Sequence, residues 1–337
     1  KWVAILAAIL LGIACMLTSY AISPIMLVLG FFLARLAGKG ALDLSASTLA
    51  PQWFITRRAL VIMLVGLGGT AGGVLFPLLN TYLITTFGWR AAFRFLAGGL
   101  WLIYVPVTLV FLISRPEDVG MSPENTSRPQ DDSSSTTYAH EEPSFQRSQA
   151  IRTFAFWAIA LCVFQSTLVG TGVVLHFVSI AETQGFSMSF AAKVMGMKPL
   201  ISLITTVLAG LILDRIGRYH YILAAACLLQ VVGYMLLAFL STANMAFLYA
   251  LVGGIAGGLI SICVGVMVPN LFGRRYLGGI LGVLVAINVV GSAIGPVLFG
   301  AGFDWAQGYK EVIILSSLLP LLAGVLCLFI RKPVLRG

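Results

Sequence analysis

Ten long apolar runs, separated by short polar or Gly/Pro-bearing connectors, make up most of this 337-residue chain. A helix needs about 20 mostly apolar residues to cross the hydrocarbon core of a bilayer, and each run has about that length or more. Backbone polar groups in lipid must be satisfied within the segment, which favours helices. We therefore expect an all-α membrane protein with ten spans, at residues 2–22, 24–50, 59–86, 93–114, 153–180, 190–213, 219–240, 245–268, 278–302 and 311–330.

The composition excludes most water-soluble classes of protein. Hydrophobic residues make up 59% of the chain and charged residues only 10%, whereas a soluble globular domain has about 25% charged residues. So few charges cannot cover a water-facing surface, which excludes a soluble enzyme, a nucleic-acid-binding domain and a disordered protein. The spans also hold no pairing of nucleophile and base at a useful spacing, so we do not expect an enzyme.

The basic residues indicate how the chain crosses the membrane. With Lys1 in the cytoplasm and alternating sides, most of the 21 basic residues fall in cytoplasmic segments, as the positive-inside rule requires. We therefore expect a multi-pass protein of the cell membrane with a cytoplasmic C-terminus. The net charge of +9 is explained by this distribution and needs no nucleic-acid partner.

Residues 115–152 interrupt the apolar pattern. This segment holds most of the acidic residues and almost no aliphatic ones, a composition that predicts an aqueous, cytoplasmic linker. It divides the chain into an N-terminal bundle, 1–114, and a C-terminal bundle, 153–337. The five cysteines lie in apolar runs without a CxxC or a His/Cys cluster, so we interpret them as packing residues and expect neither a metal nor a cofactor.

An internal repeat relates the two bundles. Residues 51–57 (PQWFITR) match residues 269–275 (PNLFGRR) at an offset of 218, and Pro77 matches Pro296 at 219. The offset covers six spans, an even number, so the copies have the same orientation and form parallel repeats. Residues 153–218 have no N-terminal counterpart, and we therefore expect a full protein of twelve spans of which this chain lacks the first two.

The connector after the sixth run carries a family signature. Residues 210–218 read GLILDRIGR, which resembles the G-x-L-x-D-R-x-G-R cytoplasmic loop of the major facilitator superfamily. The resemblance covers the whole chain and implies a gating loop made of Asp214, Arg215, Gly217 and Arg218. The alternative is a positively charged loop with a helix cap.

The same resemblance implies the architecture. Members of the family have two six-helix bundles that rock around a central cavity, and their first, fourth, seventh and tenth spans line it. In this chain the fourth, seventh and tenth correspond to 24–50, 153–180 and 245–268.

Three charged residues lie inside the second run. Arg35, Lys39 and Asp43 are spaced four residues apart and share one helix face. A charge at bilayer depth costs about 2.5–3.5 kcal/mol, so such residues are usually functional or paired. Asp43 can act as a charge partner for Lys39, which leaves the stripe a net positive charge. We expect Arg35 and Lys39 to bind substrate, the alternative being that Arg35 pairs with an acid on an absent span.

The C-terminal bundle adds further candidates for substrate binding. Lys198 lies inside the span that begins near 190, and His176 lies inside the span 153–180. Histidine is the side chain that most readily gains and loses a proton at physiological pH, so His176 is also a candidate proton carrier. The alternatives are snorkelling for Lys198 and helix packing for His176. Asn288 is a further polar candidate, whose alternative is a hydrogen bond between helices.

A cavity with net positive charge attracts anions, and basic residues bind carboxylates well. The pattern resembles the oxalate/formate and monocarboxylate carrier branches of the superfamily. We therefore expect a monomeric secondary transporter of a small organic anion such as a monocarboxylate, moved with a proton or by exchange. Two alternatives stay open: an exporter of drug-like or neutral solutes, and a membrane sensor that does not transport.

Overall fold

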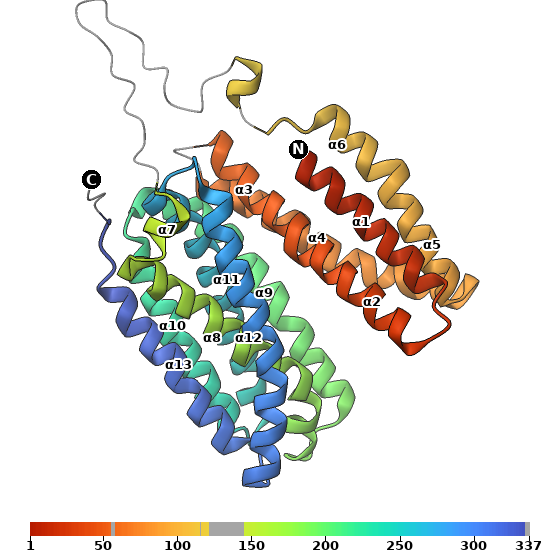
Figure 1. Ribbon diagram of the computed structural model, residues 1–337. Coiled ribbons are helices and arrows are strands. Elements are labelled where there is room, and N and C mark those ends of the chain that lie inside the picture. Colours follow the sequence, from red (N-terminus) through yellow and green to blue (C-terminus); the bar gives the residue numbers. More distant parts are fainter. Residues whose placement is uncertain (55–57, 115, 121–144, 334–337) are drawn as a thin grey trace, which may run out of the picture. The chain divides into compact units, whose positions relative to one another are not determined.

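Every regular element in the described part of the chain is a helix (Figure 1). The computed structural model describes residues 1–54, 58–114, 116–120 and 145–333. The elements of the first half are α1 (Trp2–Ser19), α2 (Pro24–Arg35), the π-helix η1 (Leu36–Leu42), α3 (Asp43–Trp53), α4 (Arg58–Phe87), α5 (Trp89–Gly99), the π-helix η2 (Leu100–Tyr104) and α6 (Val105–Phe111). The later elements are η3 (Pro116–Val119), α7 (Arg147–Ala150), α8 (Phe154–Glu182), α9 (Met188–Ile216), α10 (Tyr219–Ala238), α11 (Ala243–Phe272), α12 (Leu277–Ala306) and α13 (Lys310–Leu328).

The helices are long and apolar enough to cross a membrane. Nine helical spans of the described residues meet both criteria, with α2–η1–α3 counted as one span, Pro24–Trp53, and α5–η2–α6 as another, Trp89–Phe111. In addition, α4 runs for 30 residues and contains the apolar stretch Leu60–Gly69. The ten runs expected from the sequence therefore all form helices, and the expected fold class is confirmed.

The helix boundaries agree with the internal repeat. The span Pro24–Trp53 and α11 each have 30 residues, and so do α4 and α12. Within each pair both boundaries are offset by 219 residues. The two halves of the chain therefore repeat the same order of helices in the same direction.

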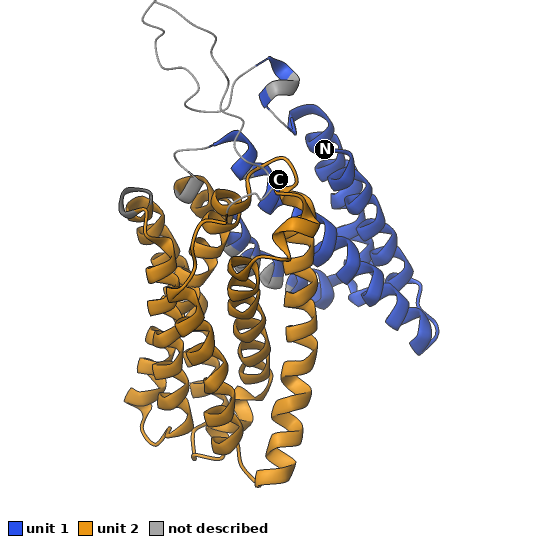
Figure 2. Cartoon of the chain, turned by 60° about the vertical axis from the view of Figure 1, so that its left-hand side comes forward, with its two compact units in different colours: residues 1–56, 67–136 blue, residues 57–66, 137–337 orange. Residues whose placement is uncertain are grey.

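The chain divides into two compact units, shown in Figure 2. Unit 1 comprises Lys1–Thr56 and Leu67–Thr136, and unit 2 comprises Arg57–Gly66 and Thr137–Gly337. In unit 1, α1 packs against α2, η1 and α5. The absence of a side chain at Gly12 leaves room for the indole of Trp101 from η2, whose Nε1–H donates to the Ile9 carbonyl at 3.3 Å.

Unit 2 is built from closely packed pairs of helices. Helix α8 packs against α12, α9 against α11, and α10 against both α11 and α13. Gly291 and Gly295 permit the first contact, because a Cβ atom at Gly291 would lie 2.9 Å from the Phe164 carbonyl oxygen. Small residues let helix backbones approach in lipid, where packing rather than the hydrophobic effect drives association. The five cysteines are all buried and unbridged, as expected for packing residues.

Part of the segment expected to be an aqueous linker is packed onto unit 2. Phe145 is buried, its N–H donates to the Phe272 carbonyl at 2.9 Å, and its ring lies edge-on to that of Phe272 at 5.8 Å. The short helix α7 follows, with a buried Ala150. Phe145 therefore packs against the C-terminal end of α11, although the average composition of residues 115–152 is polar.

Candidate substrate-binding site

Lys39 and Asp43 form an ion pair in unit 1. The Lys39 Nζ atom lies 2.7 Å from an Asp43 carboxylate oxygen. Lys39 belongs to the π-helix η1 and Asp43 begins α3, and both side chains are about half exposed. The pairing expected from the four-residue spacing is therefore present, and the two charges cancel.

Arg35 ends α2, directly before the π-helix. It lies eleven residues after Pro24, the first residue of its span, and its side chain is exposed within the chain. At 1.5 Å per residue this position is about 16 Å along the helix, well inside the thickness of a bilayer core of about 30 Å. Arg35 therefore lies far from either end of its 30-residue span.

Lys198 is held by an aromatic residue rather than by an acid. Its Nζ atom donates to the Tyr249 hydroxyl at 3.2 Å and lies 5.1 Å from the centre of the same ring. Tyr249 is 1% exposed and stacks on Phe177 at 5.8 Å, so it forms a rigid platform. Among the described residues, no carboxylate forms an ion pair with Lys198, and the ammonium keeps two further N–H donors.

The close approach of α9 and α11 positions this lysine. A Cβ atom at Gly253 would lie 3.2 Å from Lys198 Cε, and one at Gly254 would lie 2.8 Å from the Lys198 carbonyl oxygen. The glycines thus provide the space in which the lysine side chain reaches Tyr249. Lys198 lies ten residues after the first residue of α9, a distance of about 15 Å along the helix.

His176 has protein partners at both ring nitrogens. Nδ1 lies 3.1 Å from the Tyr309 hydroxyl, and Nε2 lies 3.1 Å from the Pro296 carbonyl oxygen. The ring also stacks on Phe299 at 6.2 Å. With both nitrogens occupied, His176 has no free ring atom to offer a substrate in this conformation.

The candidates of unit 2 have separate surroundings. Asn288 is half-buried on α12, Lys198 contacts α11, and His176 contacts α12 and the start of α13. Sequence reasoning missed Tyr249 and Tyr309, which hold Lys198 and His176. No local sequence pattern could reveal either contact, because 51 residues separate Lys198 from Tyr249 and 133 residues separate His176 from Tyr309.

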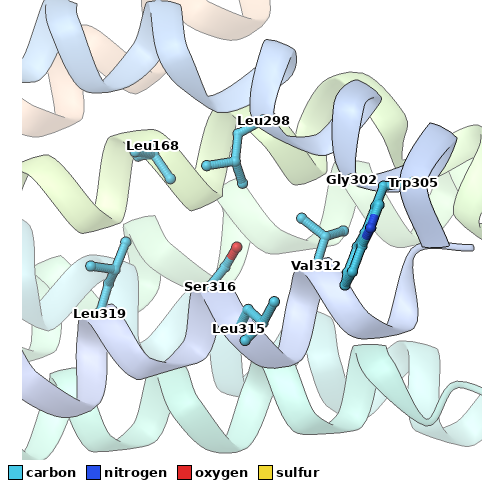
Figure 3. Close-up of a pocket in the computed structure, with 8 residues that line it drawn as sticks. All are labelled: Leu168, Leu298, Gly302, Trp305, Val312, Leu315, Ser316 and Leu319. Carbon is cyan, nitrogen blue, oxygen red and sulfur yellow. The ribbon is translucent and has the colours of Figure 1, made fainter.

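A pocket of about 300 Å³ lies elsewhere in unit 2 (Figure 3). Its lining comes from α8, α12 and α13, and none of the predicted site residues belongs to it. Its hydrogen-bonding side-chain groups are the Ser316 hydroxyl and the Trp305 indole N–H. The lining consists of Leu168, Leu298, Gly302, Trp305, Val312, Leu315, Ser316 and Leu319. Such walls suit an apolar group and not a carboxylate. The described residues also contain no group of three His, Cys, Asp or Glu side chains able to hold a metal.

The family model described as Major Facilitator Superfamily matches residues 1–250 and 194–337, which together cover the whole chain. The chain belongs to this superfamily. It is a family of transporters rather than of enzymes, and the assignment agrees with the apolar helices of a multi-pass membrane protein.

Two curated relatives in the superfamily are transport proteins of Emericella nidulans and Aspergillus niger. The aspyridones efflux protein apdF of Emericella nidulans is 22% identical over 304 residues, which cover 88% of this chain and 57% of the relative. The MFS-type transporter pynF of Aspergillus niger is 23% identical over 256 residues, or 74% and 53% of the two chains. The present chain therefore spans about half the length of the curated relatives it matches.

Solved structures of superfamily members share the fold. The human organic anion transporter MFSD10 (TETRAN) matches with a TM-score of 0.72 at 16% identity, covering 96% of this chain and 76% of that one. The transporter FucP in its outward conformation matches with a TM-score of 0.69 at 14% identity, covering 97% and 82%. At these identities the likeness concerns the arrangement of helices alone.

The loop that resembles the superfamily signature joins α9 to α10. Gly217 follows α9 as its C-cap in a left-handed conformation with φ of 65°, where residues with a side chain are strained. Arg218 precedes α10 and is exposed. The side chains of Asp214 and Arg215 lie outside the described part of the structure.

Proposed function

We propose that the protein is a monomeric secondary transporter that moves a small organic anion, such as a monocarboxylate, across the cell membrane by alternating access. Membership of the superfamily supports the transport mechanism, as do the nine spans and the additional long helix α4 of the described residues. We place the linker and the C-terminus in the cytoplasm, where the basic connectors belong under the positive-inside rule. The loop residues Asp214, Arg215, Gly217 and Arg218 are proposed to form the gate.

The anionic cargo is supported above all by the surroundings of Lys198. This half-buried ammonium rests on the buried Tyr249, and no described carboxylate neutralises it. A cation inside the bilayer is costly unless a negative charge accompanies it. A visiting carboxylate would accept hydrogen bonds from the two N–H donors that Tyr249 leaves open.

Hydrogen bonds to a charged group contribute about 1.5–3 kcal/mol. Removal of a contact between Lys198 and a substrate carboxylate should therefore weaken the affinity for the substrate by about tenfold to hundredfold. Tyr249 holds the ammonium in place before the substrate arrives, which lowers the entropy lost on binding.

In unit 1 we propose Arg35 as the residue that contacts the substrate. Its planar guanidinium donates two parallel hydrogen bonds to a carboxylate. Lys39 is less suited to this task because its charge is already met by Asp43 at 2.7 Å. We assign Lys39 and Asp43 the role of a neutral pair beside Arg35, and Asn288 the role of a polar contact for an uncharged part of the substrate.

A second candidate function is the export of a larger, apolar solute. One relative carries the name of an efflux protein, and the pocket of Figure 3 offers apolar walls. In this case Lys198 and Tyr249 would serve helix packing, and carboxylates would not compete with the cargo.

Transport by the protein in liposomes separates these functions. We expect radiolabelled lactate to accumulate inside the liposomes and unlabelled carboxylates to compete with it. Transport of tetraphenylphosphonium, a lipophilic cation, without competition from lactate would support the exporter and contradict the anion. Lactate binding without any flux would indicate a sensor and contradict the transport mechanism.

A further inference from the structure

A hydroxyl group without a hydrogen-bond partner faces the pocket of Figure 3. Ser316 on α13 is 5% exposed, and its hydroxyl has no hydrogen bond to any of the described residues. Its oxygen atom is directed into the pocket (Figure 3). The adjacent Ser317, by contrast, donates to the Ile314 carbonyl at 2.6 Å. A hydroxyl in apolar surroundings is costly unless it is hydrogen-bonded, so Ser316 offers a contact to a ligand.

The pocket is a groove between α12 and α13, which both pack against α8. Its base is formed by buried side chains, among them Leu168 of α8 and Val312 of α13. Trp305 of α12 and Leu315 of α13 are exposed and form its rim. The groove is therefore closed at its base and open along a side of exposed apolar residues, which is typical of a surface that meets a membrane.

The position of the groove along the helices places it in one half of the bilayer. Trp305 is the last residue but one of α12, and tryptophans gather at such helix ends where the membrane meets water. Ser316 lies six residues after Lys310, the first residue of α13. At 1.5 Å per residue its hydroxyl is about 9 Å along the helix, within half of a bilayer core of about 30 Å.

The lining excludes charged lipid groups. None of the eight residues that line the pocket is charged, so a carboxylate or a phosphate would be left without a counter-charge. A plain acyl chain is also a poor fit, because it cannot satisfy the Ser316 hydroxyl and because leucine walls are no more apolar than the surrounding lipid tails. Selectivity must therefore come from a hydrogen bond to Ser316.

The groove is also short. On each helix the lining residues extend over seven positions, from Leu298 to Trp305 and from Val312 to Leu319, which is about 10 Å. Half of a bilayer core, which an acyl chain fills, is about 15 Å. The groove therefore suits a compact apolar body with one uncharged hydrogen-bonding group. A sterol has this chemistry: its fused rings carry a single hydroxyl.

We propose that this pocket binds a sterol from the bilayer, whose hydroxyl exchanges a hydrogen bond with Ser316. A hydroxyl both donates and accepts, so either partner can supply the hydrogen. The volume of about 300 Å³ holds about ten groups of the size of a water molecule, which is room for part of the ring system while the remainder stays in the lipid. The site lies apart from Lys198 and goes beyond the proposed transport function.

Photolabelling of the protein in phosphatidylcholine vesicles tests the proposal. The probe is a sterol that keeps its hydroxyl and carries a diazirine on its side chain, and mass spectrometry locates the labelled residues. We expect the labels to concentrate between residues 298 and 319. Two competitors differ only in the hydroxyl, since cholestanol has it and cholestane lacks it. The hydrogen bond should make cholestanol the stronger competitor by about twofold to tenfold.

Neighbouring serines provide the matched variants. Ser316→Ala removes the hydroxyl and keeps the space, so the two competitors should become equal. Ser317→Ala is the control, because Ser317 is buried to the same extent on the same helix but already has a partner, and it should behave as the unaltered protein. Leu298→Trp fills the groove from its side and should abolish the labelling between residues 298 and 319.

The outcomes separate the sterol from other occupants. Equal competition by cholestanol and cholestane in the unaltered protein would mean that any apolar body fills the groove, acyl chains included, and would overturn the proposal. Labels spread over all helices without preference would overturn it as well, and so would a preference for cholestanol that persists in Ser316→Ala. Lactate uptake is measured separately, and its absence would overturn the proposed function while leaving the sterol site intact.

Discussion

The Lys39 ammonium lies 2.7 Å from the Asp43 carboxylate, one helical turn away in the same span. Lys198, by contrast, donates to the Tyr249 hydroxyl at 3.2 Å. The two lysines thus have different electrostatic surroundings. Asp43 neutralises Lys39, whereas no described carboxylate forms an ion pair with Lys198. This difference decides which of them we expect to affect transport.

The ion pair between Lys39 and Asp43 predicts that removal of both charges together has little effect on transport. Asp43→Asn leaves the charge of Lys39 without its partner, whereas Lys39→Gln with Asp43→Asn removes both charges together. Because the pair is half exposed, we expect a change in stability of only about 0.5 kcal/mol. Lactate uptake by the double variant should be within about twofold of the unaltered protein, which is a difference of about 0.4 kcal/mol. A large loss in the double variant would show that Lys39 itself contacts the substrate.

The close contact between α8 and α12 predicts that alanine lowers the stability of the protein at Gly295 and raises it at Gly170. A Cβ atom at Gly295 would collide with the Leu168 carbonyl oxygen and lie 2.7 Å from Thr171 Oγ1, whereas one at Gly170 meets nothing within 4 Å. Overpacking costs about 1–3 kcal/mol, and alanine favours a helix over glycine by roughly 0.5–1 kcal/mol. Gly295→Ala should therefore lower the unfolding temperature in detergent, and Gly170→Ala should raise it. Equal shifts would mean that the helices are not in close contact.

The buried hydrogen bond between Gln165 and Gln230 predicts that substitutions at the two positions have non-additive effects on stability. The Gln165 Nε2 atom donates to Gln230 Oε1 at 2.8 Å and to Ser166 Oγ at 2.9 Å, and Gln165 is fully buried. Gln230→Leu should destabilise the protein by about 1 kcal/mol, because polar contacts between membrane helices contribute about that much. The additional change Gln165→Leu removes the orphaned amide and should restore part of the loss. A double variant less stable than the sum of both single variants would contradict this pairing.

The sequence was sufficient to predict the elements of the fold. Mostly apolar residues fill runs of about 20 positions or more, and in lipid a helix satisfies all the backbone polar groups of such a run within the run itself. The pairing of Lys39 with Asp43 was also predictable, because residues four apart on a helix are neighbours. The π-helices η1 and η2 were not, since the extra residue in their turns leaves no mark in an apolar pattern.

The partners of the candidate residues required the tertiary structure. Tyr249 reaches Lys198, and Tyr309 reaches His176, from helices far away in the chain. The sequence around a tyrosine in an apolar run does not distinguish a side chain that only packs from one that also contacts a cation. The position of Lys198 inside an apolar run could be read from the sequence. That no described carboxylate forms an ion pair with it could be seen only in the tertiary structure, in which α9 packs against α11.

Lactate uptake by two lysine variants of α9 tests the central claim most directly. Lys198 rests on Tyr249, while Lys193 lies five residues earlier on the same helix and is exposed. If Lys198 binds the carboxylate, Lys198→Gln should weaken the apparent affinity for lactate by about tenfold or more, and Lys193→Gln should leave it unchanged. Equal affinity in the Lys198→Gln variant and the unaltered protein would contradict the account.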